Sequence, residues 1–166
     1  MSISYEFPEV YVEGVSGDYY IVYSNGVYSF SSEPVGEKYY GHILYEDIIR
    51  EAIDLVKAVS TREFIVVPRY KREGDLEALR VSRDARLCIM EVAGVQPIVF
   101  LSEGDIVEEG DKIAYIITGK SEVRVYKSLC SGIVVLVVNI TWEKPEKYIV
   151  VVVKQDDVRR IIIKRS

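Results

Sequence analysis

One stretch of the sequence is written twice, and this duplication constrains the fold more than any other feature. Residues 97–119 align without a gap to residues 132–154. The two copies read PIVFLSEGDIVEEGDKIAYIITG and GIVVLVVNITWEKPEKYIVVVVK. Each copy consists of an apolar strand, a polar turn region and a second apolar strand. Because neither copy can bury its apolar face alone, we expect the two ribbons to clasp each other around a pseudo-twofold axis.

The composition narrows the class of protein. The chain has 166 residues, of which 49% are hydrophobic, so it can bury a core of ordinary size. Its formal net charge of −5 weighs against a nucleic-acid partner, because such binding depends on surplus Lys and Arg. Many charged residues with few Gln, Asn, Met and Cys are typical of a thermophile. No segment resembles a signal peptide and no apolar run could cross a bilayer, so we expect a cytoplasmic protein without membrane contact.

The two cysteines are too few for a disulfide framework in a chain of this length. We expect Cys88 and Cys130 to be buried small apolar side chains. A disulfide between them is the alternative, which the cytoplasm of a hyperthermophile permits.

Residues 1–85 predict an N-terminal α+β portion. Two β-prone stretches flank Asn25-Gly26, a dipeptide that suits a type I′ turn, which predicts a hairpin over residues 18–30. Apolar residues then recur at helical spacing and predict one main helix over residues 45–60: Ile48, Ile49, Ala52, Ile53 and Val56.

Residues 86–166 are nearly all strand-forming and end in a predicted strand over residues 158–164. Without a Gly/Ser or Pro linker between the two portions, we expect residues 1–85 and 86–166 to pack together as one unit.

The segment EGDIVEEGDKIAYIITGK resembles the first half of a biotinyl or lipoyl domain. In that family a turn of type G-D-x-V-x-x-G-D/Q-x-L leads through a strand to the modified lysine. The lysine position falls on Lys120, and EVRVYKSLCSGIV resembles the strand leading to the family's second-half glycine, here Gly132. The turn positions match as follows: Gly104, Asp105, Val107, Gly110, Asp111 and Ile113. The resemblance covers residues 90–153.

This resemblance implies a fold of the α+β class that is mostly β. It consists of a biotinyl/lipoyl-like flattened β-barrel of two quasi-symmetric halves, preceded by a small α+β portion with one main helix. Lys120 would lie at an exposed hairpin tip. Ribbons lying in separate sheets, or a buried Lys120, would count against the kinship. The longer pattern RLCIMEVAGVQPIVFLSEGD resembles a family of uncharacterised archaeal proteins with such a barrel-sandwich hybrid C-terminal half.

The neighbours of Lys120 decide what the resemblance implies for function. A biotin carrier has Met on both sides of the lysine, and a lipoyl carrier usually has Asp before and Ala after, whereas Gly119 and Ser121 stand here. We therefore expect an unmodified Lys120, no cofactor, and a non-enzymatic binding or assembly module with a protein partner or a second copy. The first alternative is a swinging-arm carrier with lipoate or biotin on Lys120. The second is an enzyme with a site at the junction of the two halves.

Other candidate sites have simpler interpretations. His42 is the single histidine, so a histidine metal site or catalytic triad lacks its partners, and we predict no catalytic residues and no metal. No phosphate-binding glycine motif occurs. We expect solvated side chains in the acidic run Glu103, Asp105, Glu108, Glu109 and Asp111. We expect an ion-paired surface from the basic residues Arg69, Lys71, Arg72, Arg80, Arg83 and Arg86.

Overall fold

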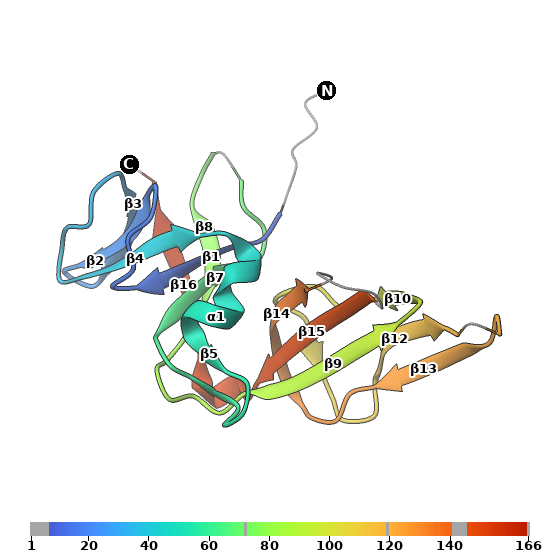
Figure 1. Cartoon of the computed structure of the whole chain (residues 1–166). Coiled ribbons are helices and arrows are strands. Elements are labelled where there is room, and N and C mark those ends of the chain that lie inside the picture. The colour runs from blue at the N-terminus through green and yellow to red at the C-terminus, as the bar shows by residue number, and fades with distance from the viewer. Residues whose placement is uncertain (1–6, 72, 119, 141–145, 166) are drawn as a thin grey trace. The chain divides into compact units, whose positions relative to one another are not determined.

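The computed structural model describes residues 7–71, 73–118, 120–140 and 146–165, and these are mostly in β-strands (Figure 1). The chain divides into two compact units, which we describe separately. Unit 1 comprises residues 1–85 and 157–166, and unit 2 comprises residues 86–156. No helix in the described part of the chain is long and apolar enough to span a membrane.

Unit 1 is a closed barrel of seven strands in the order β1-β4-β2-β3-β16-β8-β7. Neighbouring strands are antiparallel except for the parallel pair of β16 and β3. Closure leaves the sheet without free edges. The strands are β1 (Glu9–Glu13), β2 (Tyr20–Ser24), β3 (Val27–Ser31), β4 (Lys38–Ile43), β7 (Phe64–Val67), β8 (Leu76–Val81) and β16 (Val158–Lys164).

The last strand of the chain closes this barrel. β16, red in Figure 1, follows a short 3-10 helix, η2 (Gln155–Asp157), and pairs with β8 on one side and β3 on the other. The prediction that residues 86–166 form one domain is therefore wrong for residues 157–166. A single sequence marks 158–164 as a strand, but the strand's partners lie more than 75 residues earlier and leave no local signal.

The hairpin expected over residues 18–30 is formed by β2 and β3, with Ser24 opposite Val27. Asn25 and Gly26 have φ angles of 52° and 79°. A type I′ turn requires positive φ at both central positions, which Asn and Gly tolerate best.

The helix predicted over residues 45–60 is wrong in length. A 3-10 helix, η1 (Tyr45–Asp47), leads into α1 (Ile48–Ala52), and the chain then extends as β5 (Ile53–Asp54) and pairs with β6 (Val59–Ser60). Asp54 Oδ1 accepts the backbone N–H groups of Val56 and Lys57, both at 2.9 Å, so its side chain stabilises a turn that replaces the helix. Val56 is 95% exposed and takes no part in the apolar stripe.

The barrel interior is apolar in its middle and polar towards its ends. On β1, Glu9, Tyr11 and Glu13 alternate with Val10 and Val12, so the pleat turns the first three to the same face. The middle is filled by a buried cluster from all seven strands: Tyr11, Ile21, Tyr28, Tyr40, Ile65, Val67, Leu76, Ala78 and Ile163. On the outside, α1 packs against β1.

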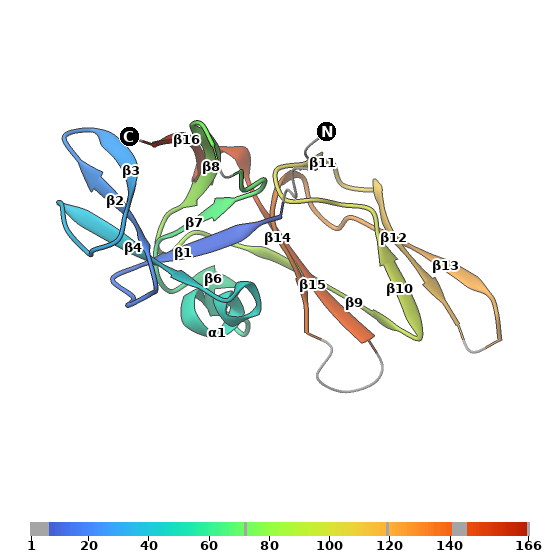
Figure 2. The ribbon, with the colours of Figure 1, turned by 90° about the horizontal axis from the view of Figure 1, so that it is seen from above.

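Unit 2 consists of two sheets that share one core. The first has the order β10-β12-β13 and the second β11-β14-β15-β9 (Figure 2). Buried side chains of both sheets form a common cluster that includes Val92, Ile113, Ile116, Val134 and Val150. The strands are β9 (Cys88–Gly94), β10 (Gln96–Val99), β11 (Ile106–Val107), β12 (Lys112–Ile117), β13 (Val123–Lys127), β14 (Gly132–Asn139) and β15 (Glu146–Val153).

The duplicated sequence forms two antiparallel ribbons, β10–β12 and β14–β15, but they lie in separate sheets. Among the described strands, only β11 crosses over, because this strand of the first copy pairs with β14 of the second. The register also differs, since Ile98 lies opposite Tyr115 whereas its counterpart Ile133 lies opposite Val153 rather than Val150. The two ribbons therefore meet across the shared core, as expected, but they do not join one sheet and their registers differ. The counterpart of β11, near Trp142, lies outside the described residues.

Cys88 and Cys130 form a disulfide, with Cα atoms 6.6 Å apart. The expectation of two free, buried cysteines is wrong. The bond joins the start of β9 to the segment between β13 and β14, 42 residues away in sequence. Their spacing alone carries no information on pairing, which only the sheet arrangement supplies.

Candidate functional site

The hairpin of β12 and β13 carries Lys120 in its connecting turn, where the side chain is exposed. Thr118 fixes this turn: its N–H donates to the Glu122 carbonyl at 2.8 Å, and its carbonyl accepts the Ser121 N–H at 2.9 Å. Ser121 has a φ angle of 61°. Gly119 lies outside the described residues. The tip is therefore a turn stabilised by backbone hydrogen bonds that presents a lysine.

Two Gly-Asp turns precede this hairpin and have the same construction. In each, the Asp carboxylate accepts the backbone N–H of the residue three positions earlier: Asp105 from Ser102 at 2.8 Å, and Asp111 from Glu108 at 2.9 Å. The preceding glycines, Gly104 and Gly110, both have a φ angle of 94°. Because a left-handed φ favours Gly and an Asp side chain can mimic a backbone turn, turn formation explains the two aspartates of the acidic run.

The outer face of the β10-β12-β13 sheet is apolar. Ala114 and Ile116 of β12 point into the core, so their neighbours Tyr115 and Ile117 point outward. Two cross-strand rows result: Ile98, Tyr115 and Val125 form one, and Gln96, Ile117 and Val123 form the other. The exposed fractions are 49% for Ile98, 62% for Val123 and 43% for Val125.

An aromatic pair extends this surface. The ring of Phe100 packs edge-on against that of Tyr115, with centroids 4.4 Å apart, and 44% of Phe100 is exposed. We call six side chains the outer face: Ile98, Phe100, Tyr115, Ile117, Val123 and Val125. Neither cross-strand row contains a charged residue. An exposed apolar sheet face of this kind marks an interaction surface more often than single exposed apolar residues do.

One edge strand of this sheet, β13, is protected against strand addition. No described strand pairs with the second side of β13. Arg124 and Lys127 lie on β13 and are exposed, and charged side chains on an edge strand disfavour pairing with another chain. The face of the sheet is therefore a better docking surface than its β13 edge.

A buried carboxylate organises one end of the unit 1 barrel. Glu63 is only 7% exposed, and its Oε2 accepts the hydroxyl of Tyr40 at 2.6 Å. Lys38 Nζ lies 3.4 Å from Oε2, and Arg80 Nε lies 3.5 Å from Oε1. Arg80 also donates to the hydroxyl of Tyr28 at 2.7 Å. Glu63 is thus held by one hydroxyl and two cations.

Glu13 lies beside Glu63, and the two carboxyls share a hydrogen bond. Burial and this hydrogen bond raise the pKa of Glu13 above its ordinary value. Burial alone would raise the pKa of Glu63, but the hydrogen bonds from Tyr40 and Glu13 and the charges of Lys38 and Arg80 lower it. When the pair holds a single proton, that proton therefore belongs on Glu13, which then donates to an ionised Glu63.

A second polar cluster surrounds His42. Its Nδ1 lies 2.8 Å from Asp18 Oδ1, its Nε2 lies 3.7 Å from Glu9 Oε1, and its ring stacks on Tyr19 at 4.3 Å. The buried Glu9 accepts the hydroxyls of Tyr11 at 2.5 Å and Tyr19 at 2.8 Å. Among the described residues, no group of three or more His, Cys, Asp or Glu could hold a metal ion.

The basic residues of the middle of the chain do not form one surface. Arg80 reaches into the barrel to Glu63, whereas the Lys71 carbonyl accepts the guanidinium of Arg165. That guanidinium also lies over the rings of Phe30 and Tyr70, at 5.0 and 5.2 Å. Arg72 lies outside the described residues.

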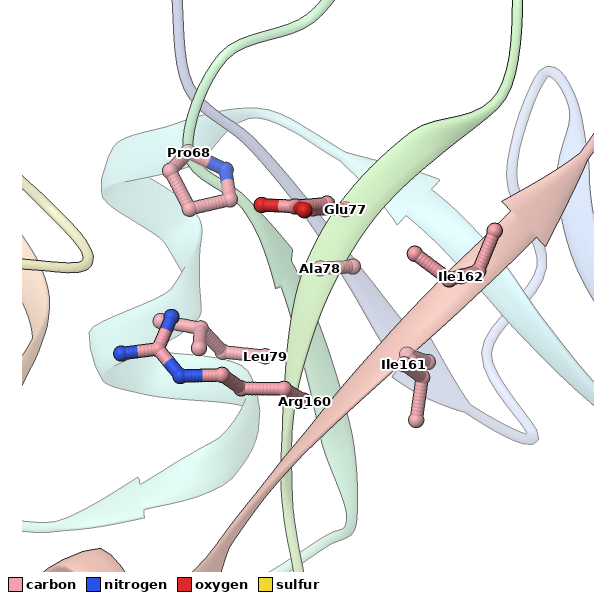
Figure 3. A pocket seen from close by; sticks show the side chains of 7 residues that line it. All are labelled: Pro68, Glu77, Ala78, Leu79, Arg160, Ile161 and Ile162. Atoms are coloured by element: carbon pink, nitrogen blue, oxygen red, sulfur yellow. The ribbon is translucent and has the colours of Figure 1, made fainter.

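A shallow pocket on the outside of the barrel is too small for a substrate. It lies over β8 and β16 and has a volume of about 130 Å³. Figure 3 shows the side chains that line it: Glu77, Ala78 and Leu79 of β8, Arg160, Ile161 and Ile162 of β16, and Pro68. Small-molecule sites usually measure roughly 300–1,000 Å³.

Sequence reasoning missed both the outer face and the Glu13–Glu63 pair. The run Glu9-Val-Tyr-Val-Glu13 does indicate that Glu13 points into the barrel with Tyr11, because the period of two in a strand places Glu9, Tyr11 and Glu13 on one face. Nothing local could indicate which side of β10, β12 and β13 stays uncovered, since that depends on where the second sheet packs.

Comparison with known proteins identifies the family of the chain. Residues 5–155 match the family model described as uncharacterized proteins conserved in archaea (DUF2118). No curated protein matches the chain in sequence.

Proposed function

Since the chain belongs to this family of uncharacterised proteins conserved in archaea, we propose, on structural grounds, that it is a non-enzymatic assembly module that pairs with a second copy of itself. The observation that supports this proposal is the outer face of the β10-β12-β13 sheet. Burying its six apolar side chains would remove water from surface that the monomer leaves exposed.

A second copy is the occupant that best fits the charge of this face. Neither cross-strand row contains a charged residue, so two outer faces can meet around a twofold axis without placing like charges opposite each other. A partner with a strongly charged surface would bury its charges against apolar side chains, at a cost in desolvation.

The size of the outer face sets the expected affinity. Three short strands supply fewer residues than the roughly 20–30 per side of a standard interface, so the contact falls among the weak ones. We therefore expect a reversible dimer with a dissociation constant in the micromolar range.

Sedimentation of the full chain over a concentration series tests this proposal. Val125→Lys places one lysine from each copy within the contact, at the end of one cross-strand row, so the dimer should weaken at least about tenfold. The matched control is Val27→Lys, because Val27 is a strand valine of unit 1 with a similar exposed fraction, 47%. A monomer at every concentration, or equal effects of both variants, would contradict the proposal.

The exposed Lys120 supports a second candidate, a swinging-arm carrier with lipoate or biotin on this lysine. The two Gly-Asp turns and the hairpin tip favour it, whereas the separate sheets of the two ribbons weigh against kinship with such carriers. The mass of the intact protein purified from its native source decides between the candidates. We expect the unmodified mass.

A further inference from the structure

We propose that the pocket at the Glu13 end of the unit 1 barrel binds a small organic anion through an oxyanion group. The pocket has a volume of about 380 Å³, which falls within the range of small-molecule sites and exceeds what a bare inorganic ion needs. It is lined by Glu13, Gly14, Thr61, Arg62, Glu63 and Arg83.

The two arginines of the pocket come from segments that a buried serine ties together. Ser60 is fully buried; its hydroxyl donates to the Ser82 carbonyl at 2.6 Å and accepts the Ala85 N–H at 3.0 Å. The Ser60 N–H also donates to the Ala85 carbonyl at 3.0 Å. These bonds fix the turn that carries Arg83 against the segment that carries Arg62.

Charge in this region favours an anion. Lys38, Arg62, Arg80 and Arg83 supply four positive charges, and Glu13 and Glu63 supply at most two negative ones. Positive charge therefore exceeds negative charge whether or not Glu13 keeps its proton. A cationic ligand would meet net repulsion.

The carboxylate of Glu63 already has its own partners, so the donors of Arg62, Arg83 and Thr61 remain for a ligand. Glu63 lines the pocket but is already engaged by Tyr40, Lys38 and Arg80, so it does not compete for Arg83. Arg62 uses one N–H on the Glu13 carbonyl at 3.2 Å and keeps its remaining donors. Guanidinium groups bind phosphate and carboxylate oxygens through paired hydrogen bonds, and Thr61 adds a hydroxyl.

Titration of the full chain with three probes tests this proposal and identifies the oxyanion. The probes are inorganic phosphate, ribose 5-phosphate and succinate, and binding is followed through the amide NMR signals of Gly14 and Thr61. Stronger binding of ribose 5-phosphate than of inorganic phosphate would assign a phosphate ester, and saturation by succinate would assign a carboxylate. The proposal is wrong if none of the three probes shifts these signals.

Substitution of Arg83 gives the specific control. Removing one charge-assisted pair should weaken the bound probe about tenfold or more, because such bonds contribute on the order of 1.5–3 kcal/mol. Arg159→Ala removes another exposed arginine, from β16, and should leave affinity unchanged. Equal weakening in Arg83→Ala and Arg159→Ala would show non-specific attraction and overturn the proposal. If Arg83→Ala does not fold, Arg83→Gln provides the same comparison.

Discussion

Replacing Glu63 with alanine should lower the free energy of unfolding of the barrel by about 3 kcal/mol, near the lower end of the range for breaking a buried ion pair. The change removes the carboxylate that pairs with Arg80 and accepts the hydroxyl of Tyr40 inside unit 1. We expect the lower end because the Lys38 side chain is about half exposed and can regain water. Urea denaturation followed by tyrosine fluorescence measures the effect.

Two further variants separate the ion pair from the hydrogen bond. Tyr40→Phe removes only the 2.6 Å hydrogen bond and should cost about 1 kcal/mol or slightly more. Glu77→Ala removes an exposed glutamate from β8 and should change stability by less than about 0.5 kcal/mol. If Glu63→Ala is as mild as Glu77→Ala, then Glu63 does not organise this end of the barrel.

The carboxyl pair also gives stability a defined dependence on pH. Because the folded-state pKa of Glu63 is lowered, its contribution is present above the unfolded pKa and is lost as pH falls through the folded value. Glu13 has the opposite sign: its raised pKa stabilises the fold below the unfolded pKa, and this contribution is lost as pH rises through the folded value. In Glu63→Gln, the part of the acid-induced fall in the free energy of unfolding that comes from Glu63 should be absent.

Removing the disulfide should lower the stability of unit 2 by about 4 kcal/mol, the chain-entropy value for a closed loop of this length. The bond spans 42 residues and joins β9 to the segment before β14, so without it the unfolded chain gains much conformational freedom. Hydrogen exchange at amides of β9 and β14 measures the change in the Cys88→Ser, Cys130→Ser double variant. This readout reports on unit 2 itself.

A reducing agent provides the matched control. It should destabilise the wild-type chain as much as the double substitution does, and it should leave the double variant unchanged. Unaltered exchange in a wild-type chain whose two thiols have been shown to be reduced would mean that the disulfide contributes nothing to the fold.

Local signals in the sequence predicted local structure. Asn25-Gly26 specified a type I′ hairpin, and the Gly-Asp pairs specified the two turns before β12, because φ preference and side-chain hydrogen bonds act within a few residues. The apolar spacing over residues 45–60 failed because Asp54 satisfies two backbone N–H groups in a turn, which hydrophobic periodicity does not register.

Features that depend on distant segments could not be predicted. The pairing of Cys88 with Cys130, the return of β16 to the first barrel and the contact of Glu13 with Glu63 all join segments separated by more than 40 residues. The candidate surface was missed for the same reason. Ile98 and Val125 are apolar residues of the kind that usually fill a core, and only the packing of the second sheet shows that they stay exposed.

Native mass spectrometry of the protein from its own source tests assembly through the outer face most directly, because it reports stoichiometry and modification together. We predict a species of twice the unmodified chain mass that dissociates on dilution and is absent from Val125→Lys. A chain that remains monomeric at high concentration, or one whose mass is raised by a lipoyl or biotinyl group on Lys120, would contradict the account.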